Sequence, residues 1–214
     1  MTLATDVEPS LAGLYSSAPA PLPFAPSLHI RAFLLQREPG NLLIYSAPTL
    51  RADTFAEVGP VERVYLGHRH EAAFGSDLPE VPLFVHADDS AAVARTRPVR
   101  ATFSRRHMLD DDFEVIPTPG HSPGASTFLW NNGEHRFLFT GDTIYLRDGE
   151  WVAAVLDSSD RDAYLRSLGL IREQDFDVLV PWAAGAGETP YALSDRDNAH
   201  RRIDAIIERL RSSS

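Results

Sequence analysis

The chain of 214 residues contains no cysteine, and all 20 of its basic side chains are arginine, so lysine is absent as well. Without cysteine the protein has no disulfide framework, no thiolate nucleophile and no cysteine-ligated zinc or iron–sulfur site. Any transition metal must then be held by imidazole and carboxylate groups, which favours zinc, iron or manganese. The absence of lysine also excludes Schiff-base chemistry.

Positive charge and long apolar runs are also scarce. The net charge is −10, which argues against a nucleic-acid partner because phosphate binding needs a basic face. No apolar run approaches the ~20 residues that a membrane span requires, and the first ten residues lack the basic start and apolar stretch of a signal peptide. We therefore expect a cytoplasmic protein with a small-molecule substrate or ligand and no membrane partner, and leave open whether it forms a homodimer.

The chain length fits a single domain preceded by an arm. Residues 1–28 are rich in proline, alanine and serine, which predicts an irregular or partly mobile arm that could cover a pocket or contact a second subunit. Residues 29–214 form the predicted domain. We expect strands at 29–36, 42–46, 63–66, 82–85, 113–117, 126–130, 136–140 and 178–180, and helices at 49–58, 88–96, 160–172 and 195–211. Two groups of strands with helices after each favour two sheets packed face to face.

A pair of histidines follows the predicted strand at 63–66. In extended backbone, residues two apart point to the same side, so His68 and His70 can face one point in space. Two neutral imidazoles at one point form half of a tetrahedral zinc site. Taken alone, two surface histidines flanking an arginine are the simpler interpretation of this pair.

Two later stretches each place a potential ligand at a strand end. Prolines and glycines fix a rigid turn around His121, directly after a strand, and a metal ligand must be held within about 0.5 Å. Asp142 follows the strand at 136–140, where a buried carboxylate is costly unless it is paired or bound to a cation. The simpler alternatives are a connector with an incidental histidine, and a salt bridge to an arginine.

In this order, the HxH pair, the TPGHSPG loop at 118–124 and the FTGDT strand end at 139–143 resemble the fingerprint of the metallo-β-lactamase superfamily, closest to glyoxalase II-like hydrolases. The resemblance runs from about residue 29 to residue 183. It implies an α+β fold, a four-layer αββα sandwich with two mixed sheets face to face and helices outside. It also implies that His68, His70 and His121 ligate one metal and that Asp142 is the family's bridging carboxylate.

The sequence departs from the family pattern at the positions that would serve a second metal. Ala72 and Ala73 stand where the family has an aspartate and a histidine. The segment 181–185 contains no histidine, and Trp182 replaces a glycine there. Tyr45 stands where an aspartate usually ends the second strand. The resemblance therefore implies one metal at most.

Two classes of function are compatible with these residues. A three-histidine zinc with an open fourth position can lower the pKa of its water to about 7, so metal-bound hydroxide from one divalent ion, zinc or else iron or manganese, could hydrolyse a small ester, thioester or lactone. Asp142 and Glu71 are the predicted catalytic residues: Asp142 could orient the hydroxide, and Glu71 could act as an acid/base or extra ligand. The alternative is a catalytically inactive member of the family that binds a ligand, a partner or a structural metal.

Overall fold

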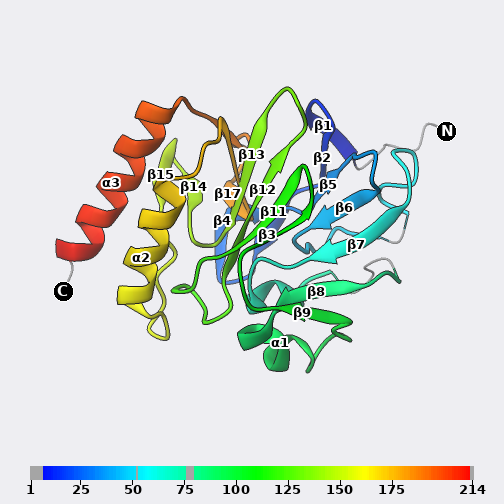
Figure 1. Cartoon of the computed structure of the whole chain (residues 1–214), viewed down its shortest axis with the longest axis horizontal. Helices are drawn as coiled ribbons and strands as arrows, with labels where there is room; N and C mark the ends of the chain where they lie inside the picture. Colours follow the sequence, from blue (N-terminus) through cyan, green and yellow to red (C-terminus); the bar gives the residue numbers. More distant parts are fainter. Residues whose placement is uncertain (1–6, 52, 76–79, 213–214) are drawn as a thin grey trace.

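The computed structural model describes residues 7–51, 53–75 and 80–212, whose strands form two large sheets (Figure 1). The first sheet contains, in spatial order, β1 (Val7–Leu11), β2 (Leu14–Ser17), β5 (Phe33–Leu35), β6 (Asn41–Ile44), β7 (Val61–Tyr65), β8 (Leu83–His86) and β9 (Ala101–Phe103). Neighbouring strands are antiparallel from β1 to β6 and parallel from β6 to β9.

The second sheet contains, in spatial order, β10 (His107–Asp110), β11 (Phe113–Pro117), β12 (Ser126–Asn131), β13 (Arg136–Gly141), β16 (Val178–Pro181) and β18 (Ala192–Leu193). Only the pairing of β13 with β16 is parallel among these described strands. The helices are α1 (Ala87–Val93), α2 (Arg161–Arg172) and α3 (Arg196–Ser212), with a 3-10 turn, η1, at Arg69–Ala73. No helix in the described ranges has the length and apolar character that crossing a membrane requires.

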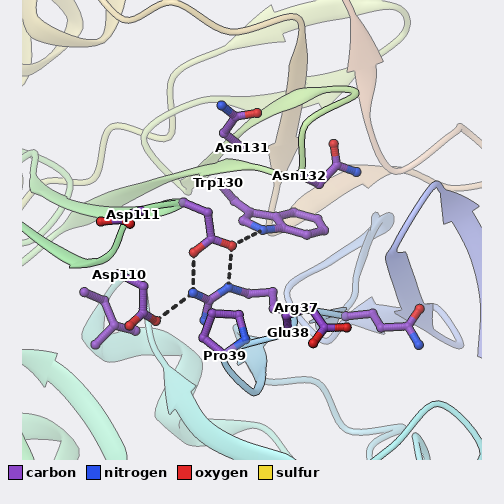
Figure 2. A pocket seen from close by; sticks show the side chains of 11 residues that line it. Arg37, Glu38, Pro39, Asp110, Asp111, Trp130, Asn131 and Asn132 are labelled. Atoms are coloured by element: carbon purple, nitrogen blue, oxygen red, sulfur yellow. Dashed lines mark hydrogen bonds and ion pairs between the residues drawn. The ribbon is translucent and has the colours of Figure 1, made fainter.

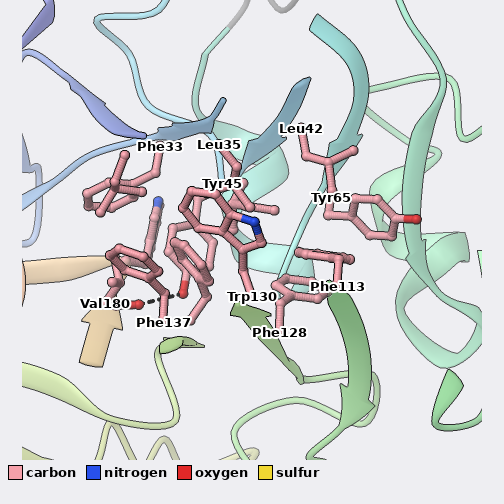
Figure 3. Close-up of a cluster of buried hydrophobic side chains, with 14 of the residues drawn as sticks. Phe33, Leu35, Leu42, Tyr45, Tyr65, Phe113, Phe128, Trp130, Phe137 and Val180 are labelled. Atoms are coloured by element: carbon pink, nitrogen blue, oxygen red, sulfur yellow. Dashed lines mark hydrogen bonds between the residues drawn. The ribbon is translucent and has the colours of Figure 1, made fainter. Parts of the chain in front are cut away.

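Three apolar clusters separate the layers of the molecule. The central cluster lies between the two sheets and is built largely from aromatic side chains such as Phe33, Tyr65 and Phe128 (Figure 3). A second cluster packs α2 and α3 against the outer face of the second sheet. A third buries Val93 of α1 and the turns before β7 against the outer face of the first sheet. These three interfaces make a four-layer αββα sandwich, so the predicted fold is confirmed.

Most predicted elements are present within a few residues of their expected ends. The strands at 113–117, 126–130 and 136–140 correspond to β11, β12 and β13, and the helices at 160–172 and 195–211 to α2 and α3. Asp160 begins α2, because its carboxylate accepts a hydrogen bond from the Ala163 amide at 2.8 Å. Side chains at helical spacing then bury one face of α2 against the second sheet.

The helix predicted at 49–58 is wrong. The described part of this segment forms consecutive turns, in which the Thr54, Ala56 and Val58 amides each bond to the carbonyl three residues earlier. Leu50 and Phe55 are nevertheless buried against the first sheet. The apolar spacing thus marked a buried face correctly, but it did not distinguish linked turns from a helix.

The irregular arm predicted for residues 1–28 is also wrong for its described part, residues 7–28. β1 and β2 extend the first sheet. β3 (Ala20–Leu22) and β4 (Ala25–Ile30) form a hairpin, and β4 pairs with β17 (Ala183–Gly185). The arm is therefore held by backbone pairing with strands far along the chain.

A further hairpin, β14 (Tyr145–Arg147) with β15 (Glu150–Val152), lies beside α3.

A buried arginine links the two sheets at one end of the sandwich. Figure 2 shows Arg37, which follows β5, beside Asp110 at the end of β10. The same guanidinium also bonds the carboxylate of Asp112, in the turn between β10 and β11. The Arg37 Nε atom donates to Asp112 Oδ2 at 2.9 Å, and the Trp130 indole donates to the same oxygen at 3.2 Å. The pairing explains how a cation with only 1 % of its side chain exposed is tolerated.

We expect Arg37→Met to lower the free energy of unfolding by about 2 kcal/mol. The substitution leaves two carboxylates without their cation, and the loss is moderated because water still reaches both of them. Urea denaturation of the purified proteins measures the change. Arg105→Met is the control, because Arg105 is exposed and its substitution should change stability by less than about 0.5 kcal/mol. Equal stability of the two variants would contradict this role of Arg37.

Candidate metal centre

Three histidines and one aspartate meet at the carboxyl ends of strands from both sheets. His68 and His70 lie at the turn that follows β7, His121 lies in the loop after β11, and Asp142 directly follows β13. The nitrogen donors of the three histidines lie within 4.8 Å of one another. The structure thus brings together the four residues that the sequence predicts as metal ligands.

The distances among these groups suit a tetrahedral ion. Asp142 Oδ2 lies 3.3 Å from His68 Nε2 and 3.5 Å from His121 Nε2, and His70 Nδ1 lies 3.0 Å from His121 Nε2. Four donors around one zinc ion lie about 3.4 Å apart. Both ring nitrogens of His68 are buried and form no hydrogen bond of normal geometry within the described residues, and their contacts to Glu71 and Asp142 are charge pairs. An unpartnered buried nitrogen is costly unless a ligand uses it, so the donor set fits a divalent metal.

Two of the imidazoles are oriented through their second nitrogen. His121 Nδ1 lies 2.7 Å from the carbonyl oxygen of Ala154. His68 Nδ1 lies 2.9 Å from Glu71 Oε1. Metal-ligating histidines usually have such a partner, which fixes the ring and its tautomer. In both rings the Nε2 atom is thereby left to face the cluster.

Glu71 lies beneath His68 rather than in the open cavity. Its carboxylate accepts hydrogen bonds from the backbone amides of Gly67 and His68, at 2.9 and 3.1 Å. The side chain is completely buried. Burial raises the pKa of Glu71, although the neighbouring His68 opposes this. The 3-10 turn η1, where the sequence predicted an extended loop, is what folds Glu71 back onto His68.

A second buried carboxylate, that of Asp89 in α1, joins the two loops that carry the histidines. It accepts hydrogen bonds from the Arg69 amide at 2.9 Å, the Ser122 hydroxyl at 2.6 Å and the Gly124 amide at 3.1 Å. A Cβ atom at Gly124 would lie 2.7 Å from the Asp89 carboxyl carbon, so only glycine permits this approach. Nothing in the sequence distinguishes Asp89, because an acid in the first turn of a helix is ordinarily explained by the helix dipole.

Burial and the charges within the cluster shift the pKa values of its members. Burial lowers the pKa of His68, but the carboxylates of Asp142 and Glu71 outweigh burial and raise the pKa to about 10. Burial and the charges of His68 and His121 lower the pKa of His70 to about 4. The pKa of Asp142 is lowered, because the neighbouring histidines outweigh its burial. At neutral pH the metal-free cluster therefore contains an ionised Asp142 and a protonated His68.

Trp182 and Tyr45, which lie near the cluster, offer no free side-chain atom to a metal ion. Trp182 is 2 % exposed, its ring centre lies 5.2 Å from that of His68, and its indole donates to the Ser46 carbonyl oxygen at 2.7 Å. The Tyr45 hydroxyl donates to the Val180 carbonyl oxygen at 2.9 Å and accepts from the Gly141 amide at 2.7 Å. Both polar atoms are used within the protein.

A cavity of about 670 Å³ leads from the surface to the cluster. His70, His121 and Asp142 line its floor, while His68 and Glu71 lie behind it. The β3–β4 hairpin of the arm contributes Leu22, Phe24 and Leu28 to one wall. From the sequence, the arm could cover a pocket or contact a second subunit. The pairing of β4 with β17, next to Trp182, places the hairpin at the mouth of this cavity.

The chain belongs to the metallo-β-lactamase superfamily. Residues 48–183, more than half of the chain, match the Metallo-beta-lactamase superfamily, which confirms the predicted family. A hydroxyacylglutathione hydrolase of Erwinia tasmaniensis is 30 % identical over 105 residues, 47 % of this chain and 39 % of that protein. The chain thus matches well under half of the length of this relative.

Solved structures show the same fold at low sequence identity. A metallo-β-lactamase from Erythrobacter litoralis has a TM-score of 0.70 at 14 % identity, covering 98 % of this chain and 99 % of that one. The FIM-1 enzyme of Pseudomonas aeruginosa, in its mono-zinc form, has a TM-score of 0.67 at 12 % identity, with coverage of 95 % and 94 %. An archaeal superfamily protein from Sulfolobus tokodaii has a TM-score of 0.66 at 16 % identity, with coverage of 94 % and 87 %.

We expect Asp89→Asn to weaken zinc binding by about ten- to a hundredfold. The amide keeps the size of the side chain but cannot accept all three hydrogen bonds, so the histidine loops lose their common anchor. Titration calorimetry of the metal-free protein measures the affinity. Asp88→Asn is the matched control, because the neighbouring Asp88 side chain is 64 % exposed. A merely structural role would lower thermal stability in Asp89→Asn without changing zinc affinity.

The metal-free protein should be most stable near pH 6.5. His68 is protonated in the folded state up to a pKa of about 10, so stability is lost as pH rises from about 6.5 to 10. His70 resists protonation down to a pKa of about 4, so stability is also lost as pH falls from about 6.5 to 4. Urea denaturation across this range tests both limbs. Glu71→Gln should reduce the alkaline loss, and a constant free energy of unfolding above pH 6.5 would contradict the assignment.

Proposed function

We propose that the protein is a mononuclear metal-dependent hydrolase of a small ester, thioester or lactone. The observation that carries the proposal is the convergence of three imidazoles, those of His68, His70 and His121, beside the Asp142 carboxylate at an apolar cavity. A purely structural metal site is normally closed to solvent, whereas a catalytic site keeps access for water and substrate. The cavity supplies that access.

One divalent ion, zinc or else iron or manganese, would be held by the three imidazoles and would supply a nucleophilic water at neutral pH and a Lewis acid for the acyl carbonyl. Asp142 is the proposed catalytic residue. Its lowered pKa keeps the carboxylate ionised, so it accepts a hydrogen bond from the attacking water and orients it. The reaction consumes one water and splits the acyl C–O or C–S bond, giving a carboxylic acid and an alcohol or thiol.

Glu71 acts in this proposal as a positioning residue. Its contact with His68 Nδ1 and its two bonds to backbone amides hold the imidazole with Nε2 toward the cluster. It does not line the cavity, so a role as acid or base toward substrate has no geometric support.

A single ion is favoured over two. Ala72 and Ala73 line the cavity without offering a donor, and the Trp182 indole fills the space beside His68. Among the described residues, His68, His70 and His121 form the one group of three potential ligands with converging atoms. The fold alone does not decide this question, because function resides in the site.

Metal loading followed by an activity screen tests the proposal. We expect the purified protein to bind one zinc per chain and to hydrolyse at least one member of a panel of small esters, thioesters and lactones. His121→Ala should lose the ion and lower kcat/KM by at least about a hundredfold, because a tetrahedral site loses a donor. His107→Ala is the control, since His107 lies in β10, outside the cluster.

Each other outcome counts against a defined part of the proposal. Two ions per chain would contradict the mononuclear site. Stoichiometric metal without turnover of any panel member would overturn the hydrolase and favour a ligand-binding protein with a structural metal. Activity that survives both chelation and His121→Ala would remove the metal from the reaction.

A further inference from the structure

The walls of the cavity have two chemically different parts. Among the described residues, five large apolar side chains are exposed, and Phe24, Val155 and Leu156 are three of them. All three line this cavity. Phe24 lies between β3 and β4 and is 80 % exposed. Exposed apolar groups that gather around one opening mark a surface that an apolar ligand covers.

The other part of the wall carries positive charge. Arg69 and Arg95 both line the cavity, and Asp142, which faces the histidines, is the one acid among its described lining residues. No ion pair joins either arginine to another described residue. Arg69 Nε lies 3.5 Å from His70 Nε2, so this guanidinium is beside the metal cluster. In a chain of net charge −10, such a local excess of cations is a specific feature.

A third arginine, Arg97, is bonded to backbone carbonyls instead of facing the cavity. Arg97 Nε donates to the Ala72 carbonyl oxygen at 3.1 Å, and the same guanidinium also bonds the carbonyls of Phe74 and Gly75. These hydrogen bonds of Arg97 fix the end of η1 and the residues after it, and Arg97 does not line the cavity. The guanidinium group of Arg95 has no comparable structural use in the described parts of the chain, and that of Arg69 makes the 3.5 Å contact with His70.

We propose that the substrate of this cavity is an amphipathic anion, with an apolar group against Phe24, Val155 and Leu156 and an oxyanion held by Arg69 and Arg95. Guanidinium groups bind carboxylate, sulfonate and phosphate oxygens through charge-assisted hydrogen bonds. The inference deepens the proposed function and rests on it for the word substrate. The recognition itself requires neither a bound metal nor turnover.

Two fluorescent probes that differ by one anionic group test the inference. Anilinonaphthalenesulfonate has an aromatic body and a sulfonate, and N-phenylnaphthylamine has the same ring system without the sulfonate. Both are titrated into the metal-free protein, so that the sulfonate cannot bind a metal. We expect the sulfonate probe to bind at least about tenfold more tightly, and this preference to shrink at high salt because Arg95 is exposed.

The double variant Arg69→Gln/Arg95→Gln should bind the two probes equally, with the neutral probe unchanged from wild type. Phe24→Ser should weaken both probes, and Arg105→Gln, outside the cavity, should change neither. Equal affinity of the wild type for both probes, or a sulfonate preference that survives the double variant, would overturn the inference. A protein that is inactive on every ester but keeps the arginine-dependent preference would refute the hydrolase and leave the anion site standing.

Discussion

The geometry of the candidate metal centre depends on the buried carboxylate of Asp89. The two loops that carry the histidines follow strands of different sheets, and the sheets meet through apolar side chains. Hydrophobic packing is not directional, so it cannot by itself set the relative position of two loops to within a fraction of an ångström. Three hydrogen bonds from Arg69, Ser122 and Gly124 to one carboxylate are directional, and they close the gap between the loops. The helix α1 supplies this carboxylate from a third layer of the molecule.

The space next to His68 is filled by apolar side-chain surface. Trp182 is buried there, and its only polar atom is satisfied by the Ser46 carbonyl oxygen, so the indole fills the space without an unpaired donor. Ala72 and Ala73 line the cavity without contributing a polar side-chain atom. These residues and Trp182 give the cavity an apolar wall, to which the β3–β4 hairpin contributes as well.

Local sequence signals identified the four candidate ligands because each lies beside a strong marker. His121 sits among prolines and glycines that can form only a tight loop, and Asp142 ends a strongly apolar strand. The contributions of Asp89 and Phe24 left no such marker. An acid at the start of a helix and an aromatic in a proline-rich arm each have common explanations, and their partners lie far away in the sequence. The helix prediction for residues 49–58 failed for a related reason, since the buried side chains of this segment suit turns as well as a helix.

By itself, the sequence determined the family, the αββα layers and the four candidate ligands, because hydrophobic periodicity and short rigid motifs act over a few residues. Only the tertiary structure decided how those ligands are supported and what surrounds them. Glu71 became a support for His68 when η1 turned back, and the arm became a cavity wall when β4 paired with β17. Such outcomes depend on contacts between distant segments, and those are set by the packing of the whole chain.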